Sequence, residues 1–250
     1  MLDNRVREAG ARLCRLRSLG LPAVAAAALA GCVAGCATAT GSADRPSTAP
    51  PSAATEAGSQ YTASQLRAAL LTSVAGATQA TTPEAGSYGS LPGVKDTKST
   101  LKGVTIIPAH CAHAASTGLD STAFNSAPAA VTSFRRGQRG ISEVLLAPAA
   151  SIAPRALGHK VPAGCSHYRA VAGGRTFSYV VKDERAPHVG LGAREIRVHA
   201  SGAATTDIWT VIYRAKGYVG AITLIGRGTT SKQAQQVSAA AYARAQHVLH

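Results

Sequence analysis

Short runs of β-prone residues fill the second half of the chain. Val, Ile and aromatic side chains gather in these runs, and glycine or polar residues separate them. The pattern predicts strands, which we expect over residues 130–134, 141–146, 176–182, 193–199, 208–215 and 218–225. Short connections join the first two and the last two of these segments, which is typical of antiparallel hairpins.

Helical spacing of apolar residues precedes and follows the predicted strands. Apolar residues three to four apart predict a helix over residues 63–75, capped by Thr62. A second apolar stripe predicts an amphipathic helix over residues 231–249, with Ser231 as its cap. We expect a shorter, alanine-rich helix over residues 149–158.

The region between the first helix and the first strand is less regular. Glycine and proline are frequent over residues 77–100, which predicts a long loop. Residues 104–107 favour an extended segment. Pro108 then begins a helical turn that carries Cys111.

Consecutive strands with helices before, between and after them are the pattern of an α+β domain. We therefore predict a twisted antiparallel β-sheet with helices packed mainly on one face. No segment repeats at a fixed period, which argues against solenoids and propellers. Aromatic residues make up only 4% of the chain, so alanine and valine supply most of the apolar mass. Such a thinly packed core would gain from a covalent cross-link.

The first 31 residues have the pattern of an export signal. Five arginines form a basic start, and a largely apolar stretch follows over residues 19–30. As a helix this stretch would be about 18 Å long, too short for a bilayer core of about 30 Å. We interpret it as a signal segment rather than a membrane span.

The apolar stretch ends in Leu-Ala-Gly-Cys, with Cys32 last. This sequence resembles the lipobox of bacterial lipoproteins, in which the cysteine thiol takes a diacylglycerol and becomes the new N-terminus. A second copy ends at Cys36. We favour Cys32, because Leu29 still belongs to the apolar stretch. The alternative is a plain secretory signal in which small residues precede the cysteines by chance.

The segment between the lipobox and the first helix is mostly Ala, Thr, Ser, Pro and Gly. Such a composition predicts a flexible tether. The chain therefore divides into a signal peptide at residues 1–31, a tether at residues 32–60 and a folded domain at residues 61–250. The lipobox predicts that a lipid holds this domain on the extracytoplasmic face of the cell membrane.

The chain is strongly basic, with 26 Lys and Arg residues against 12 Asp and Glu and a formal net charge of +14. Arg135, Arg136 and Arg139 cluster in one predicted hairpin loop, where they are candidate contacts for an anionic ligand. A basic patch in a cytoplasmic protein would suggest nucleic acid, but export removes that partner. Anionic lipid or acidic wall polymer remains. The alternative is scattered arginines that only keep the domain soluble.

Cys111 and Cys165 are the two cysteines of the predicted domain. No glutathione pool keeps thiols reduced outside the membrane, so we predict a disulfide between them. The alternative is a Zn²⁺ or Cu⁺ site that adds His110, His113 and His167 as candidate ligands. Their spacing is unusual for zinc, and oxidation would consume both thiolates. We therefore expect no metal.

Together with the final hairpin, these cysteines resemble a family of actinobacterial exported domains that includes the extracellular sensor domain of PknH-type receptor kinases. The matching features are the Pro-led Cys111, a strand pair beyond Phe124, Cys165 followed by Tyr168, the hairpin over residues 208–225 and the C-terminal helix. The resemblance covers residues 61–250 and implies a twisted antiparallel sheet with a cleft for an unidentified envelope ligand. The kinase sensor's second disulfide has no counterpart here, and no kinase domain or transmembrane helix is present. We therefore expect a stand-alone binding or accessory role.

The common catalytic motifs are missing from the sequence. It has no Gly-x-Ser-x-Gly, His-Glu-x-x-His or phosphate-binding glycine loop. Ser99 and Lys102 match Ser-x-x-Lys without the partner motifs of penicillin-binding enzymes. We expect no enzymatic activity and no cofactor.

The prediction is a lipid-anchored, sensor-like domain that binds a small-molecule or envelope ligand. The alternative is a structural or interaction protein of the envelope that contacts anionic lipid or wall polymer through a basic face. An apolar pocket with a few polar groups would favour the first, and a flat basic face the second.

Overall fold

The computed structural model describes residues 59–202 and 204–249. Their strands form one ten-stranded sheet in the order β1-β4-β5-β10-β9-β8-β7-β6-β3, and β2 also pairs with β4. Every pairing is antiparallel, as predicted. The predicted signal peptide, both lipobox cysteines and the tether up to residue 58 lie outside the described residues. Within the described ranges, no helix is both long and apolar enough to cross a membrane.

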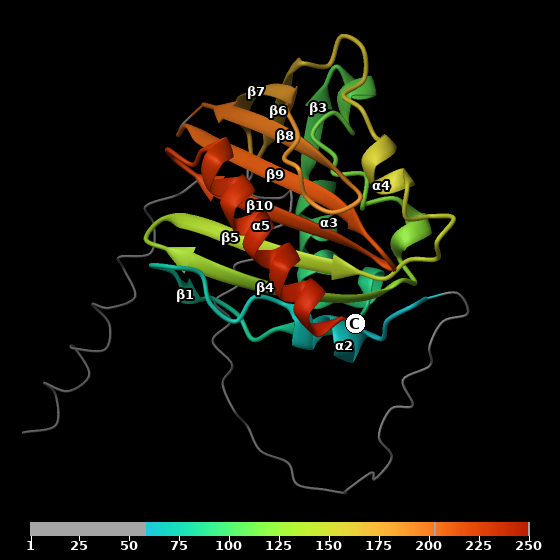
Figure 1. The fold of residues 1–250 in the computed structure, drawn as a ribbon. Helices are drawn as coiled ribbons and strands as arrows, with labels where there is room; N and C mark the ends of the chain where they lie inside the picture. The colour runs from blue at the N-terminus through green and yellow to red at the C-terminus, as the bar shows by residue number, and fades with distance from the viewer. Residues whose placement is uncertain (1–58, 203, 250) are drawn as a thin grey trace, which may run out of the picture.

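The elements appear in Figure 1 with the following bounds. The strands are β1 (Thr78–Gln79), β2 (Glu84–Ser87), β3 (Val104–Ile107), β4 (Pro128–Arg136), β5 (Arg139–Leu146), β6 (His167–Ala172), β7 (Arg175–Glu184), β8 (Gly192–Ser201), β9 (Thr206–Ala215) and β10 (Tyr218–Gly226). The helices are α2 (Ala63–Ala69), α3 (Pro92–Lys102), α4 (Arg155–Gly158) and α5 (Ser231–Val248). Single 3₁₀ turns lie at Tyr88–Ser90, Ala109–Cys111 and Thr122–Phe124.

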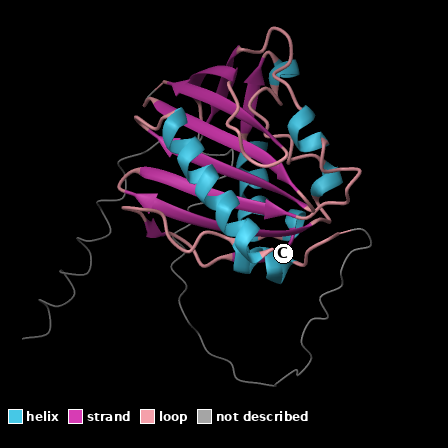
Figure 2. Ribbon diagram, in the orientation of Figure 1, coloured by secondary structure: helices cyan, strands magenta, loops and turns pink. Residues whose placement is uncertain are grey.

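Helices cover both faces of the sheet (Figure 2). On one face, here called the α5 face, Leu66 of α2 and Ala241 of α5 pack in a core with Ile222 of β10. On the other, the α3 face, Val94 of α3 packs in a second core with Ile208 of β9. The prediction that helices pack mainly on one face is not confirmed. The reason is that β9 and β10 are apolar on both sides, so each side needs a cover.

The first helix is shorter than the predicted 63–75 and ends at Ala69. Beyond it, the backbone N–H of Leu71 donates to Glu143 Oε2 at 2.7 Å. The Arg244 side chain donates to backbone carbonyls at the helix end. The backbone N–H and C=O groups at this end of the helix therefore bond to side chains that are distant in sequence, and the helix stops here.

A helix, α3, occupies part of the segment predicted as a loop. Pro92 takes its first position, where a missing N–H loses no hydrogen bond. The carboxylate of Glu84 accepts a hydrogen bond from Gly93 N at 3.2 Å and so satisfies one free donor of the first turn. Val94 is the only residue of α3 that is buried, which explains why the helical period is weak in the sequence.

The C-terminal helix begins at Ser231 as predicted, but Thr230 caps it. Thr230 Oγ1 accepts from the backbone N–H of Gln233 at 3.3 Å, and the Gln233 side chain accepts from Thr230 N at 3.2 Å. This reciprocal pair is a capping box. The alanine-rich helix predicted over residues 149–158 is reduced to Arg155–Gly158, directly after Pro154.

Candidate functional site

An apolar pocket of about 160 Å³ lies on the α3 face, between α3 and the sheet. We call it the tyrosine pocket. Its floor comes from the strands, with Tyr168, Ala170, Tyr179, Val198 and Ile208, and its walls include Tyr88, Val94, Leu101, Ala112 and Ala115. The pocket thus joins α3, five strands and the segment that follows Cys111.

Two stacked tyrosines form part of the pocket floor. Tyr168 on β6 and Tyr179 on β7 are cross-strand partners, and their parallel rings lie 5.0 Å apart, centroid to centroid. Burial raises the pKa of both hydroxyls. Burial also raises the pKa of Tyr88, with a smaller contribution from the charge of Asp120. All three hydroxyls therefore stay protonated and able to donate at neutral pH.

The three tyrosine hydroxyls share one feature. Within the described part of the chain, none of them makes a hydrogen bond, and none is among the polar atoms that are both fully buried and unpaired. Each hydroxyl is therefore at least partly accessible while its ring is buried. All three residues line the apolar pocket, and each carries one hydroxyl that can donate.

Charged residues lie at the pocket's rim. Lys98 of α3 donates to Asn125 Oδ1 at 2.9 Å. Asp120 accepts from Ser116 Oγ at 2.5 Å, and its second oxygen lies 3.7 Å from His113 Nδ1. The rim thus offers one ammonium and one carboxylate to the polar end of a ligand.

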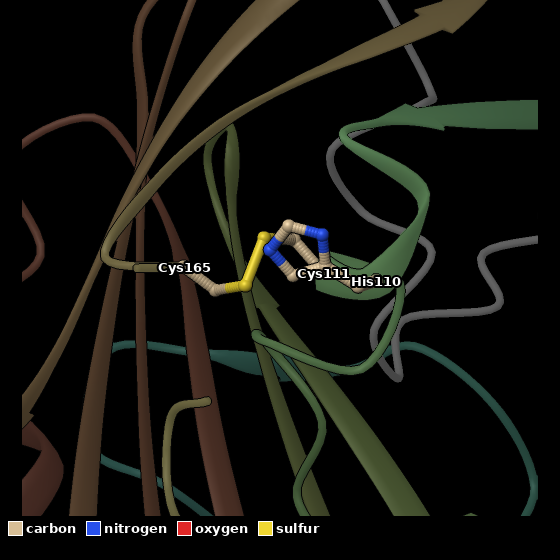
Figure 3. Close-up of side chains that lie close together, drawn as sticks. All are labelled: His110, Cys111 and Cys165. Atoms are coloured by element: carbon tan, nitrogen blue, oxygen red, sulfur yellow. A yellow bond between two sulfur atoms is a disulfide. The ribbon is translucent and has the colours of Figure 1, made fainter. Parts of the chain in front are cut away.

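A disulfide (Figure 3) links two segments that contribute residues to the tyrosine pocket. Cys111 and Cys165 are joined with an S–S distance of 2.01 Å, which is the pairing that the sequence favoured. Both cysteines are fully buried. Ala112 and Ala115 follow Cys111, and Tyr168 follows Cys165. The bond therefore ties one wall of the pocket to the strand that carries its floor.

His110 lies next to the disulfide (Figure 3). Its ring nitrogen and the two sulfur atoms lie within 4.8 Å of one another. Because a disulfide sulfur is not a thiolate, this group does not suit Zn²⁺ or Cu⁺. The other predicted ligands bind elsewhere: His113 faces Asp120, and His167 Nδ1 lies 3.0 Å from Ser166 Oγ.

The structure divides the predicted arginine cluster. Arg136 of β4 and Arg139 of β5 are cross-strand partners, and both line a second cavity on the α5 face. Arg135 is their neighbour on β4, and alternation along a strand sends its side chain to the opposite face. The strands extend further than predicted, so all three arginines lie within them rather than in a loop. They do not form one continuous basic face.

Sequence reasoning missed the tyrosine pair, because residues 167–172 were not predicted as a strand. The signal available was the alternation of Tyr168, Ala170 and Ala172 with exposed residues. Lys98 was not identified, because its helix α3 was predicted as a loop. Asp120 lies in an irregular segment, where the sequence shows neither the helical nor the strand spacing of apolar residues.

No protein-family model and no curated protein matches the chain. Among solved structures, it is similar to the extracellular domain of PknH from Mycobacterium tuberculosis, at 15% identity and a TM-score of 0.48, over 75% of this chain and 96% of that one. It is also similar to an uncharacterized protein of Mycobacterium smegmatis, an ortholog of Rv0999, at 12% identity and a TM-score of 0.42, over 70% of this chain and 91% of that one.

Proposed function

We propose that this chain is a non-catalytic, extracytoplasmic binding domain that holds the apolar group of a small ligand in the tyrosine pocket. The observation that carries the proposal is that one pocket combines apolar walls, two charged residues and three tyrosines whose hydroxyls bond to no other described residue. A few convergent polar groups in an apolar concavity are typical of ligand sites.

The pocket's volume indicates the size of that group. At about 160 Å³, it is close to the engineered cavity of about 150 Å³ that binds benzene. One aromatic ring or a short branched aliphatic group therefore fits inside. The hydroxyls of Tyr88, Tyr168 and Tyr179 would bind a polar substituent, and Lys98 and Asp120 would contact what extends past the rim.

The serine nearest the pocket supports a binding rather than a catalytic role. An activated serine donates to a histidine, which is oriented by a carboxylate. Here Ser116 donates directly to Asp120, and its oxygen also accepts from the backbone N–H of Gly118 at 2.9 Å. Its hydrogen bonds thus hold a turn, and no histidine side chain among the described residues bonds to its hydroxyl.

Filling the tyrosine pocket tests the proposal. Ala115 lines the pocket and is partly buried, so Ala115→Phe would occupy the space. We expect unmodified protein to bind phenol, with changes in the NMR chemical shifts of Tyr168 and Tyr179. Ala115→Phe should weaken phenol binding at least about tenfold, because burying the phenol ring contributes over about 1.4 kcal/mol. The matched control is Ala243→Phe, an exposed change on α5. Equal phenol affinity in all three proteins would contradict the proposal.

The proposed location rests on the lipobox sequence. We expect native protein from membranes to begin at Cys32 and to carry a diacylglyceryl group, because a lipid anchor is what this motif specifies. Intact mass would show the added lipid, and Cys32→Ala would remove it, whereas Cys36→Ala would not. An unlipidated mass in the unmodified protein would contradict the anchor without affecting the binding proposal.

A further inference from the structure

A larger cavity, of about 350 Å³, opens on the α5 face. It lies between α5, the segment after α2 and the β4–β5 hairpin. Its apolar lining includes Leu71, Val74, Ile141, Leu224 and Val237. Its polar lining consists of Ser73, Arg136, Arg139, Thr229, Gln233 and Gln236. We call it the arginine pocket; none of the described residues that line it is an Asp or Glu.

The two arginines are placed directly opposite each other. Arg136 and Arg139 form the last pair of the β4–β5 ladder, before the two-residue turn. Like charges at directly opposed positions destabilise a sheet. No acidic side chain forms an ion pair with either arginine in the described ranges. An anion between the two guanidinium groups would relieve this repulsion.

Hydrogen bonds hold both guanidinium groups in place without using all their donors. Arg136 donates through one Nη to the carbonyl of Ala75, and Arg139 donates through Nε to the carbonyl of Arg227 at 3.1 Å. A guanidinium has five N–H donors. The remaining donors have the geometry that suits a carboxylate or phosphate.

We propose that the arginine pocket binds an anionic amphiphile. Its carboxylate or phosphate head lies between Arg136 and Arg139, and its apolar chain lies between α5 and the sheet. The cavity falls within the range of about 300 to 1,000 Å³ that is usual for ligand sites. This site lies on the face of the sheet opposite the tyrosine pocket. The proposal therefore does not depend on the function proposed above.

Calorimetry on the full chain in phosphatidylcholine nanodiscs tests the site, with empty nanodiscs as the reference. We expect decanoate to bind about fifteenfold more tightly than octanoate, because each buried methylene contributes about fourfold. Decanol should bind at least tenfold more weakly than decanoate, and decyltrimethylammonium should not bind. If decyltrimethylammonium binds as tightly as decanoate, the site is not selective for anions and the proposal fails.

Two variants separate the head-group contact from the apolar one. Arg136→Gln with Arg139→Gln should weaken decanoate binding at least tenfold. Arg175→Gln, the same residue change at one exposed position of β7, should leave it unchanged. Ala240→Phe keeps both arginines but fills the pocket, so it should abolish decanoate binding. The control is Ala239→Phe, at the adjacent exposed residue that does not line the pocket, and it should leave decanoate binding unchanged. Equal decanoate affinity in the double arginine variant and Arg175→Gln would overturn the proposal.

The source of the amphiphile is decided by comparing two soluble probes. Tighter binding of decanoate than of dihexanoyl phosphatidylglycerol indicates free fatty acids. The reverse order indicates membrane phospholipid. Either order supports the site. The site is contradicted if decanoate does not bind and dihexanoyl phosphatidylglycerol binds no more tightly than zwitterionic dihexanoyl phosphatidylcholine.

Discussion

Replacing Cys111 and Cys165 by alanine should lower the free energy of unfolding by about 4 kcal/mol. The disulfide spans a sequence separation of 54 residues, so it removes considerable freedom from the unfolded chain. A loss of this size is comparable with the total stability of many domains, about 5 to 15 kcal/mol. Urea unfolding followed by far-UV circular dichroism would measure it.

The same substitution should also affect the tyrosine pocket. Because the disulfide ties the Ala112 to Ala115 wall to the strand that carries Tyr168, its removal should weaken phenol binding under conditions where the domain is still folded. Reduction of the unmodified protein should reproduce both effects. Cys36→Ala, which changes a cysteine outside the described residues, is the matched control. Superimposable urea curves for the double variant and the control would show that the disulfide is not a stabilising element.

Glu143→Gln should remove a strong pH dependence of stability. Glu143 is fully buried on the α5 face, and burial raises its pKa from 4.5 to about 7, against the opposing effects of the Leu71 N–H and the Arg244 charge. The folded state therefore keeps a proton that the unfolded chain loses. As pH rises from about 4.5 to about 7, the free energy of unfolding should fall by about 3 kcal/mol and then level off.

The glutamine variant keeps an oxygen that can accept from Leu71 N and has no proton to lose. We expect its stability to match that of the unmodified protein near pH 4.5 and to exceed it at pH 8, measured by urea unfolding. Asp96→Asn, which removes an exposed carboxylate from α3, should keep the original pH dependence. The interpretation is wrong if Glu143→Gln loses stability between pH 4.5 and 8 as steeply as Asp96→Asn does.

Local patterns predicted the elements that stand out as apolar runs or stripes. The β9–β10 hairpin was predicted closely because its strands are nearly continuous β-prone runs separated by a short turn. The C-terminal helix α5 was predicted closely because its apolar residues recur at helical spacing. The end of α2 could not be predicted. It depends on Glu143 and Arg244, which are distant in sequence and meet Leu71 only in the fold.

The candidate sites were less predictable than the strands. Arg136 and Arg139 were identified, but their separation from Arg135 depends on how far β4 and β5 extend, and strand ends are poorly marked in a sequence. The stack of Tyr168 on Tyr179 depends on the register of β6 and β7. Both pockets need a helix on each face of the sheet, and the sequence placed the helices mainly on one.

The covered faces of the sheet have a consequence for how such a domain can diversify. Along β9, Ile208 faces one core and Trp209 the other, so adjacent codons specify side chains on opposite faces of the sheet. Selection can reshape one surface while the backbone hydrogen bonds that both share stay intact. The two faces of a single small scaffold can thus change along separate mutational routes.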